Sequence, residues 1–557
     1  MCGIFAYRGS RNAAEVVFNG LLGLQYRGYD SWGIAMIGSS GLKVKKDIGA
    51  LPSRISGLTM SSQAIGHTRW ATHGGVTKSN SHPHVSCDKR FVVVHNGIIE
   101  NFNELKSKLS GIHNFTSATD TELIVHYLEE NEKIYGISGA LQKLIINITG
   151  HSAFVVLDCL TKQMYAYRSG SPLVLGKKGN EIFISSDLPT LAPQVDHIYP
   201  LHENELIDVV SGAGELDWIA SQYIKTEKSK FTTRYHMESE MYETEGILKN
   251  IINSPNTKYR EIKKYLTPSR NIVLTGCGSS YHACLFGQYL FSQIGINARA
   301  IIASEGDSVL PLISSTTTII VLSQSGETID SLDFVIKAKA KGAYIISLTN
   351  VRHSSLDRLA DTPLDLGVGI EVAVASTKAF IFMQLFFVRL VTALSNLDIS
   401  EDLNSYLKAL TILYTPSSKK RAKDLASKLV SRNNLFIVTH GDLIPLGFEA
   451  ALKFKEIGYL FTENIVSGEL KHGSLALINK DSLCLTINRS NSKEMEHTVS
   501  EIKAREGVVV AVSLPDLGML TSLYGANVIH LVSFYHSILL GHNPDRPRNL
   551  AKSVTVK

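Results

Sequence analysis

The chain begins with Met1-Cys2-Gly3-Ile4-Phe5-Ala6-Tyr7, a cysteine followed by an apolar, strand-like run. Removal of Met1 would leave the Cys2 thiol beside a free α-amine, whose ordinary pKa of about 7.7–8.0 suits it to accept a proton. Cysteine is a good nucleophile even when only a few per cent is thiolate. The stretch therefore predicts a nucleophile at the open start of a strand. The alternative is a chance cysteine behind a retained Met1.

Three further blocks follow in order, at Gly66–Gly74, His95–Asn101 and Thr119–Glu122. Together with Cys2-Gly3-Ile4 they resemble the N-terminal-nucleophile glutamine amidotransferases. Enzymes of that kind share a glutaminase domain but deliver ammonia to different acceptors. The remainder of the chain must therefore identify the acceptor.

Length and composition bound the class of protein. The 557 residues predict about three or four domains. Charged residues make up 19% and hydrophobic residues 44% of the chain, which is typical of a globular enzyme with substantial cores. The net charge of +5 is spread over 56 basic and 51 acidic residues, so we expect no nucleic-acid partner.

The cysteines are few for a long chain, which favours a reducing, cytoplasmic compartment without a signal peptide. They are Cys2, Cys87, Cys159, Cys277, Cys284 and Cys484. None forms a CxxC pair, so the sequence predicts no zinc or redox motif, and no metal or cofactor. The most apolar segment, Ala379–Leu394, is too short to span a bilayer. We expect it to be a core or interface helix, and we expect no membrane partner.

Residues 1–217 alternate β-rich runs with turns, and helical patterns interrupt them at 12–24, 102–110 and 120–133. This pattern predicts an α+β domain with much antiparallel pairing. A polar linker is expected at 218–245, with a long helical stretch beginning near 236.

The rest of the chain contains an internal duplication, with a first domain at 246–396 and a second at 397–540. Each copy has three apolar strands that alternate with helices, and the helices before the third strands are expected at 328–341 and 492–505. The strands are expected at 271–276, 318–322 and 343–347, and at 434–441, 482–486 and 508–512. Continuous apolar strands alternating with helices predict two doubly wound parallel α/β domains. An irregular tail at 541–557 follows.

Ser323–Thr328 follows the second strand of the first copy and opens a helix. Backbone N–H groups, a helix dipole and hydroxyls converge at such a turn, which suits a phosphate. A plain helix cap is the alternative. The second copy has Ile487–Asn491 at this place, with fewer hydroxyls. Gly276–Tyr281 is a similar turn that would add hydroxyls, or else only a tight turn.

Other candidates lie in the second copy and the tail. Glu449, Lys453 and Glu456 share one helical face, which by itself would be a solvated, salt-bridged face. His472 lies near the end of a polar loop, where a lone histidine is usually structural. The tail Asp545–Val556 would by default be frayed. A lysine held in an enclosed site could instead form a Schiff base with a sugar carbonyl.

The blocks along the whole chain resemble the glutamine–fructose-6-phosphate aminotransferase (isomerising) family. The blocks beyond the N-terminal ones are Gly276–Ala283, Ala303–Glu305, Ser323–Thr328, Val374–Phe380, Ala451–Ile457, Gly468–Gly473 and Pro547–Val556. The resemblance implies a glutaminase joined to two sugar-isomerase (SIS) domains. It also implies conversion of fructose 6-phosphate and glutamine to glucosamine 6-phosphate and glutamate, the entry step to UDP-N-acetylglucosamine.

In the glutaminase half, the resemblance implies that Cys2 attacks the glutamine amide and that its α-amine acts as base. Asn96 and the Gly97 N–H would form the oxyanion hole. Arg69 would hold the α-carboxylate of glutamine and Asp120 its α-amine. Trp70 would gate the ammonia path. Thr72 and His73 would also contact glutamine.

In the sugar half, His472 would open the ring and Lys552 would form the imine. Ammonia would then displace Lys552, and Glu456, assisted by Lys453, would move a proton from C1 to C2. The implied sugar-phosphate contacts are Ser279, Ser280, Ser323, Gln324, Ser325, Thr328, Val374 and Ser376. The family takes this histidine from the neighbouring subunit, which implies a homodimer or higher homo-oligomer.

Two other functions compete with this interpretation. A sugar-phosphate sensor would have lost Cys2 or Lys552, and both are present. An amidotransferase acting on a phosphoribosyl donor would need its own diphosphate loop, and none is found. The chain departs from the family at Ser474, where proline is usual, and at Trp32, where alanine is usual. The linker is short and lacks the insertion of eukaryotic members, which argues against feedback inhibition by a nucleotide sugar.

Overall fold

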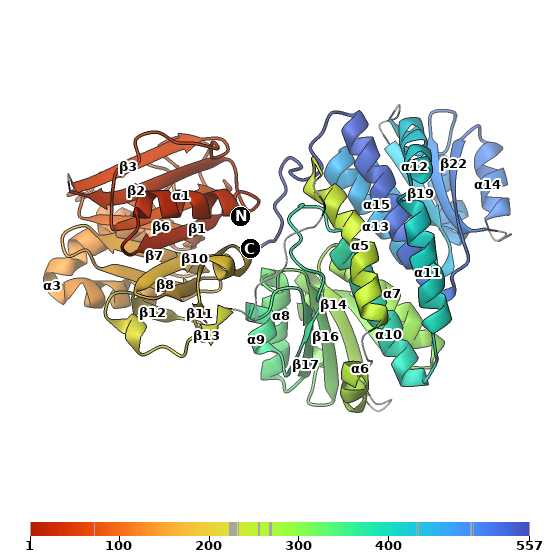
Figure 1. The fold of residues 1–557 in the computed structure, drawn as a ribbon, viewed down its shortest axis with the longest axis horizontal. Helices are drawn as coiled ribbons and strands as arrows, with labels where there is room; N and C mark the ends of the chain where they lie inside the picture. The colour runs from red at the N-terminus through yellow and green to blue at the C-terminus, as the bar shows by residue number, and fades with distance from the viewer. Residues whose placement is uncertain are drawn as a thin grey trace.

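The computed structural model describes residues 2–39, 41–71, 73–221, 231, 233–253, 257–266, 270–430, 432, 434–490, 493 and 495–555. Ten residues of the predicted linker, 222–230 and 232, lie outside these residues. The described chain contains four β-sheets. Figure 1 shows the two antiparallel sheets in one half of the molecule and the two parallel sheets in the other.

The N-terminal half is an antiparallel α+β sandwich, as predicted. Its larger sheet has the order β13-β11-β9-β10-β1-β4-β2-β3 and its smaller sheet β12-β8-β7-β6-β5. The strands of the larger sheet are β1 (Gly3–Arg8), β2 (Ser31–Gly38), β3 (Gly41–Ile48), β4 (Gln63–Arg69), β9 (Val174–Lys178), β10 (Glu181–Ser185), β11 (His197–Pro200) and β13 (Ile219–Ala220). Those of the smaller sheet are β5 (His84–Val85), β6 (Phe91–Gly97), β7 (Ser152–Asp158), β8 (Met164–Ser169) and β12 (Glu205–Asp208).

Strand β1 shows why these layers form. Phe5 and Tyr7 point to the core under a helix, whereas Ile4 and Ala6 point to the core between the two sheets. Side chains of a strand alternate between its faces, so one fully apolar strand fills two cores. The helices of this half are α1 (Ala13–Leu24), α2 (Phe102–Leu109), α3 (Glu122–Asn147) and the short α4 (Leu188–Leu191). They cover the outer faces of the sandwich.

The two parallel sheets confirm the predicted duplication. Their orders are β15-β14-β16-β17-β18 and β20-β19-β21-β22, so the first strand of each copy lies between the second and third. The strands are β14 (Asn271–Gly276), β15 (Ala298–Ile302), β16 (Thr317–Ser323), β17 (Tyr344–Thr349), β18 (Thr362–Asp365), β19 (Asn434–Thr439), β20 (Phe461–Val466), β21 (Leu483–Arg489) and β22 (Val508–Leu514).

Helices cover these sheets and join them. They are α5 (His236–Ile252), α6 (Thr257–Ile262), α7 (Ser279–Gln293), α8 (Ile329–Ala340), α9 (Ser355–Leu359), α10 (Lys378–Ser395), α11 (Ser400–Leu413), α12 (Pro416–Leu429), α13 (Ile444–Gly458), α14 (Glu496–Lys503) and α15 (Thr521–Leu539). One hydrophobic core runs through both copies, from Ile272 to Leu485, so the two parallel sheets share their packing rather than forming independent units.

Three helices test the sequence predictions in detail. In the described chain only α10 is long and apolar enough to cross a membrane, so the expectation that this segment is too short is wrong. Because 83% of that apolar window is buried, the expected core helix is confirmed. Helix α3 runs well past the predicted end at 133, with a kink at Gly136 (φ 66°, ψ 168°). Helix α14 is shorter than the predicted 492–505, of which residues 492 and 494 lie outside the described part.

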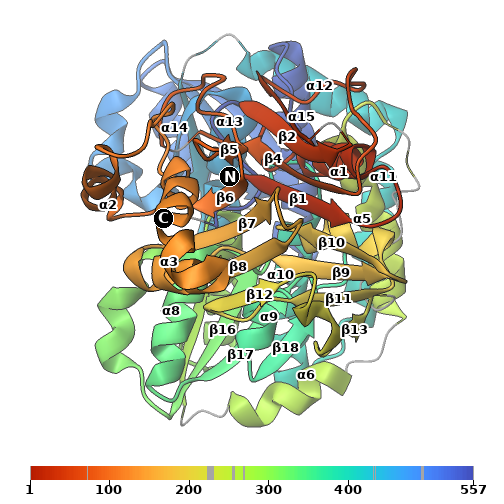
Figure 2. The same cartoon turned by 90° about the vertical axis from the view of Figure 1, so that its left-hand side faces the viewer.

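The C-terminal tail returns to the N-terminal half, and the two ends of the chain lie side by side in both views (Figures 1 and 2). The Tyr29 hydroxyl donates to the Pro547 carbonyl (2.9 Å), and Ile329 N donates to the Val554 carbonyl (2.9 Å). The expectation of a frayed tail is therefore wrong, because main-chain hydrogen bonds hold it against both halves.

A buried ion pair in the N-terminal half gives a stability prediction. Arg27 lies 2.7 Å from Asp187, with side chains 5% and 1% exposed, and Asp187 also caps α4. Replacing Arg27 by Met leaves a buried carboxylate without its counter-charge. We expect the free energy of unfolding, measured by urea denaturation, to fall by about 3–5 kcal/mol.

Arg11→Met is the matched control. Arg11 pairs with Glu181 at 2.9 Å, but its side chain is 48% exposed, so the expected loss is about 0–1 kcal/mol. Equal losses in the two variants would show that burial of the Arg27 pair has no special weight.

Candidate active site

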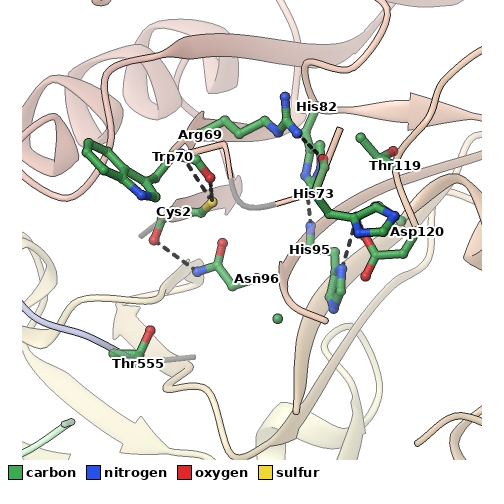
Figure 3. A pocket seen from close by; sticks show the side chains of 12 residues that line it. Cys2, Arg69, Trp70, His73, His82, His95, Asn96, Thr119, Asp120 and Thr555 are labelled. Atoms are coloured by element: carbon green, nitrogen blue, oxygen red, sulfur yellow. Dashed lines mark hydrogen bonds between the residues drawn. The ribbon is translucent and has the colours of Figure 1, made fainter. Parts of the chain in front are cut away.

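Cys2 lies at the start of β1, beside the end of β4, as the sequence predicts. The Trp70 N–H donates to Cys2 Sγ (3.3 Å), and the thiol lies 3.4 Å from the Trp70 carbonyl oxygen. Asn96 Nδ2 donates to the Cys2 carbonyl (3.1 Å), so the end of β6 meets the same point (Figure 3). Burial raises the pKa of the Cys2 thiol, and the nearby Arg69 guanidinium opposes that rise.

The pocket at Cys2 encloses about 450 Å³ of empty space, part of it open to solvent. Its lining residues are Cys2, Arg69, Trp70, His73, His82, His95, Asn96, Gly97, Thr119, Asp120, Thr121 and Thr555. Six other residues that were predicted to act in the glutaminase half therefore line this pocket together with Cys2. Thr72 lies outside the described residues.

Asn96 and Gly97 are held rigidly at the end of β6. Asn96 Oδ1 lies 3.1 Å from His67 Nε2, and burial lowers the pKa of His67 to about 3, so that imidazole is neutral and can donate. Gly97 has a φ of 137°, which favours glycine, and a Cβ there would lie 2.0 Å from the His151 carbonyl oxygen. Both constraints aim the amide of residue 96 and the backbone of residue 97 at the pocket.

Arg69 and Asp120 have the opposite charges expected for the ends of an amino acid. The Arg69 guanidinium donates to the carbonyls of Gly75 (3.2 Å), Gly74 (3.0 Å) and His73, which closes that loop onto the pocket. Asp120 is buried, and its Oδ2 accepts from Ile99 N (2.8 Å). This hydrogen bond fixes the orientation of the Asp120 carboxylate.

Sequence reasoning missed five lining residues of this pocket. His95, Thr119 and Thr121 lie inside or beside the recognised blocks, and that proximity could have suggested them. His82 packs against His67 with ring centroids 4.1 Å apart. Thr555 comes from the far end of the chain, and only the tertiary fold brings it to Cys2.

The predicted phosphate loop after β16 is compact and rich in hydroxyls. Ser323 Oγ lies 3.3 Å from Thr328 Oγ1 and accepts from Gly326 N (3.0 Å). Ser325 Oγ accepts from Glu327 N (3.1 Å) and lies 2.9 Å from Ser553 Oγ of the tail. The loop therefore meets the tail next to Lys552.

Lys552 is enclosed, and Glu371 is the partner that sequence reasoning missed. Lys552 Nζ lies 2.5 Å from Glu371 Oε2, with side chains 3% and 0% exposed. Glu371 Oε1 accepts from Thr377 N (2.9 Å) and Ala379 N (3.0 Å), at the start of α10. Burial opposes ionisation of Glu371, but the Lys552 ammonium outweighs it and lowers the pKa of Glu371 to about 2.

The three charged residues of α13 form a buried network instead of a solvated face. Lys453 Nζ lies 2.7 Å from Glu456 Oε2 and 3.2 Å from Glu449 Oε1. Lys453 and Glu449 are fully buried, whereas Glu456 is 18% exposed. Burial alone would lower the pKa of Lys453, but Glu449 and Glu456 raise it above its usual range.

The serine pair that opens α7 faces this network in part. Ser279 Oγ donates to Glu449 Oε1 (2.9 Å), and Lys453 Nζ donates to Ser279 Oγ (3.3 Å), whereas Ser280 Oγ contacts Met383 Sδ (3.5 Å). The structure thus brings Ser279 to Lys453, and within the described residues no hydrogen bond joins either serine to Ser323–Thr328. Val374 N donates to the Asp545 carbonyl of the tail (3.2 Å), and Ser376 is half-buried two residues on.

His472 ends a short 3₁₀ segment, Ser467–His472, and its side chain is exposed. Within the described part of the chain it makes no hydrogen bond or ion pair. The structure of one chain does not bring it to Lys552 or to the loop after β16.

Comparison with known proteins agrees with this arrangement. A family described as a glutamine amidotransferase domain matches residues 67–193, and the SIS domain family matches 265–393 and 428–519. The chain is 33% identical to the glutamine–fructose-6-phosphate aminotransferase (isomerising) of Pyrococcus horikoshii and 34% identical to that of Thermus thermophilus, over 100% of each chain. The C-terminal domain of glucosamine-fructose-6-phosphate aminotransferase from Francisella tularensis has a similar fold. It has a TM-score of 0.51 and 24% identity, over 58% of this chain and 100% of that one.

The backbone at Gly97 gives a prediction for this site. Gly97→Ala places a Cβ against the His151 carbonyl in a conformation that L side chains rarely adopt. We expect a loss of at least about 2 kcal/mol in the free energy of unfolding, together with slower alkylation of Cys2 by iodoacetamide. Gly75→Ala, with nothing within 4 Å of the added Cβ, should change neither quantity. A wild-type alkylation rate in Gly97→Ala would contradict this account.

Proposed function

The chain belongs to the glutamine–fructose-6-phosphate aminotransferase (isomerising) family, and from that premise we propose how its residues divide the reaction. Glutamine and fructose 6-phosphate are converted to glutamate and glucosamine 6-phosphate. One observation carries the proposal: Lys552 pairs with Glu371, while Thr555 lines the pocket of Cys2. Three residues of extended chain span at most about 11 Å, so the tail connects two reaction centres a short distance apart.

In the first centre, Cys2 Sγ attacks the side-chain carbonyl of glutamine after its proton passes to the α-amine exposed by removal of Met1. Asn96 Nδ2 and the Gly97 N–H stabilise the developing oxyanion. Collapse of the tetrahedral intermediate releases ammonia and leaves a thioester on Cys2. Water then hydrolyses the thioester and releases glutamate. Arg69 and Asp120 orient the substrate through its α-carboxylate and α-ammonium groups.

In the second centre, Lys552 Nζ attacks C2 of the open-chain sugar, and loss of water gives an imine. The ammonium must first give up a proton, and the ion pair with Glu371 Oε2 at 2.5 Å holds Nζ in place for the attack. Ammonia from the first centre adds to C2 and displaces Lys552. The sugar then carries the new nitrogen as an imine.

Isomerisation requires a base that removes a proton from C1 and returns one to C2. We assign this role to Glu456, the most exposed carboxylate of the α13 network. Lys453, fully buried, donates from Nζ to Glu456 Oε2 (2.7 Å) and holds that carboxylate in place. Ser279 and Glu449 position Lys453 in turn.

The hydroxyls of Ser323, Ser325 and Thr328 are assigned to the sugar phosphate, with Gln324 and the nearby backbone of Val374 and Ser376. Ser279 and Ser280 stay assigned to the same substrate at the opening of α7. We assign ring opening to His472 from a partner subunit, because it is exposed and, in the described residues, lacks side-chain partners. The proposed enzyme is therefore a homodimer or larger homo-oligomer, and its sparse cysteines favour the cytoplasm.

Replacing Lys552 by Ala tests the division between the two centres. The variant loses the only proposed imine-forming group but keeps Cys2, Asn96 and Arg69. We expect it to release glutamate from glutamine and to make no glucosamine 6-phosphate. Borohydride with fructose 6-phosphate should trap an adduct on the wild-type chain and none on the variant.

The opposite outcome is equally clear. Near-normal synthesis by Lys552→Ala, or an adduct on Lys453 or Lys471, would remove Lys552 from the mechanism. Lys471 is a suitable comparison because it is a half-exposed lysine paired with Glu501. The assignment of the first centre would stand in that case.

The phosphate assignment predicts a selective loss of sugar affinity. Ser325→Ala and Thr328→Ala each remove one hydroxyl that would donate a hydrogen bond to the charged phosphate. Losing such a bond weakens binding by about 1.5–3 kcal/mol. The Michaelis constant for fructose 6-phosphate should rise about 10- to 100-fold, while that for glutamine stays nearly constant. Ser490→Ala, at the corresponding turn of the second copy, is the matched control and should change neither. An equal rise for both substrates would make the loop structural.

A further inference from the structure

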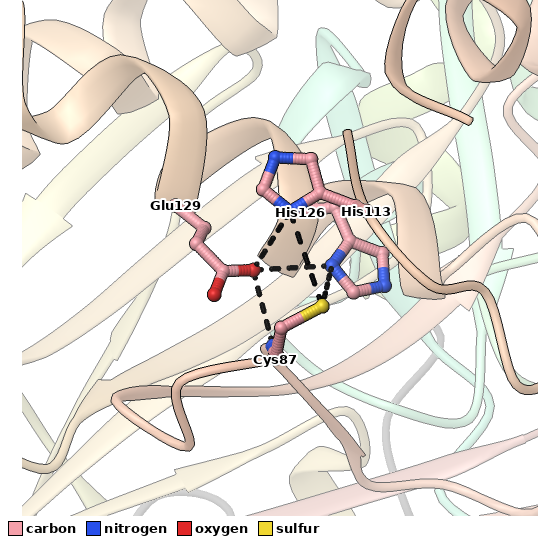
Figure 4. Close-up of side chains that lie close together, drawn as sticks. All are labelled: Cys87, His113, His126 and Glu129. Carbon is pink, nitrogen blue, oxygen red and sulfur yellow. Dashed lines mark hydrogen bonds and ion pairs between the residues drawn. The ribbon is translucent and has the colours of Figure 1, made fainter. Parts of the chain in front are cut away.

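A cluster of metal-binding side chains lies outside both reaction centres. It consists of Cys87, His113, His126 and Glu129, here called the 87–129 cluster (Figure 4). Cys87 lies in the turn between β5 and β6, and His113 lies in the loop between α2 and α3. His126 and Glu129 are one turn apart on α3. Three separate segments of the glutaminase half thus converge on one point.

The four potential ligand atoms face one another. Cys87 Sγ lies 3.8 Å from His126 Nδ1 and 4.0 Å from His113 Nδ1. Glu129 Oε2 lies 3.1 Å from His113 Nδ1 and 3.3 Å from His126 Nδ1. The histidine side chains are 7% and 1% exposed, whereas Cys87 is exposed, so the cluster is open to solvent on the side of the thiol.

The oxygen–nitrogen separations match the edges of a tetrahedron around zinc, and the sulfur–nitrogen separations are a few tenths of an ångström longer than such edges. Bonds of about 2.0–2.1 Å to nitrogen, 2.0–2.2 Å to oxygen and 2.3 Å to sulfur give nitrogen–oxygen edges of about 3.3 Å and somewhat longer sulfur–nitrogen edges. One thiolate, two imidazoles and one carboxylate are a mixed donor set that favours Zn²⁺ over Mg²⁺ or Ca²⁺. We propose that the 87–129 cluster is a structural zinc site.

The outer faces of both histidines support this assignment. His113 Nε2 lies 3.4 Å from Glu130 Oε2, and His126 Nε2 lies 3.6 Å from Glu122 Oε1. A proton on Nε2 would point at this outer carboxylate and would leave the Nδ1 lone pair toward the cluster, as in a ligating imidazole. The Nδ1 lone pairs of His113 and His126 would then face the negative Glu129 carboxylate. These groups repel one another unless a cation lies between them.

The proposed ligand carboxylate is also oriented from outside. Glu129 Oε2 accepts from Cys87 N (3.0 Å), and Oε1 accepts from Asp88 N (2.8 Å). Such hydrogen bonds are common around ligating carboxylates. They fix the turn that carries Cys87 against α3 and leave the thiol as the last ligand to close the tetrahedron, with its proton released to solvent.

A metal here would stabilise the segment that carries part of the glutamine pocket. The loop from His113 leads directly to Thr119 and Asp120, and Glu122 accepts from the backbone N–H groups of Thr116 and Ser117 (2.8 and 2.7 Å). Zinc would join that loop to α3 and to the β5–β6 turn. We therefore assign it a structural role with no part in the chemistry.

The test uses the full-length, tag-free chain carrying Cys2→Ser, because an N-terminal cysteine can itself chelate metals. After removal of metal, Zn²⁺ is titrated in competition with a chromophoric chelator. We expect one tight equivalent per chain and a higher midpoint of thermal unfolding with zinc. Replacement by Co²⁺ should give the intense visible bands of a tetrahedral ion and a thiolate-to-cobalt charge-transfer band.

Variants separate the cluster from adventitious binding. Adding Cys87→Ser, at an exposed position that the fold tolerates, should abolish the charge-transfer band and weaken binding at least about 10-fold. Glu129→Gln should weaken binding and keep the band. Cys159→Ala and the exposed His197→Ala, in the same domain, should behave as their parent. No tight equivalent in the parent chain, or the same affinity and spectrum after Cys87→Ser, would overturn the proposal.

Discussion

The buried ion pair between Lys552 and Glu371 is the contact on which the two-centre arrangement depends. Two charges removed from water cost several kcal/mol each unless they pair closely and their remaining hydrogen-bonding positions are filled. Glu371 meets this condition because its second oxygen accepts two backbone N–H groups at the start of α10. A helix in the core of the molecule thus anchors a lysine of the tail. Without the carboxylate, the enclosed ammonium would favour water, and the tail would depend on hydrogen bonds such as those to Tyr29, Ile329 and Ser325.

The network on α13 applies the same physics with a different result. Lys453 lies between Glu449 and Glu456, so one buried cation is shared by two carboxylates. Glu449 also pairs with His282 Nδ1 at 2.8 Å, which leaves the more exposed Glu456 as the carboxylate with free capacity. The duplicated domains contribute unequally to this site, because α7 of the first copy supplies Ser279 and α13 of the second supplies the charges. A shared core makes such a division between copies possible.

Much of this arrangement was predictable from local sequence, and the exceptions share one physical cause. Strand periodicity predicted both parallel sheets, and short motifs predicted that Cys2, Arg69 and Asp120 would line one pocket. A solvated face for Glu449 and Lys453, the alternative suggested by helical spacing alone, was wrong, because that spacing shows which residues share a face but not what covers it. Glu371, Thr555 and the 87–129 cluster were missed because their partners are distant in sequence. The cysteine pattern indicated no metal, since the proposed ligands come from three segments without a repeated spacing.

The position of Thr555 in the wall of the Cys2 pocket affects the ammonia that is released there. The other lining residues of the Cys2 pocket lie between residues 2 and 121, so Thr555 adds a wall from the far end of the chain. Ammonia that escaped into bulk water at neutral pH would be protonated almost at once, and ammonium has no lone pair with which to attack an imine. A wall built from the tail that carries Lys552 keeps the molecule in its basic form during its short passage. Losing that wall would leave glutamine consumption intact and would waste the nitrogen as an inert cation.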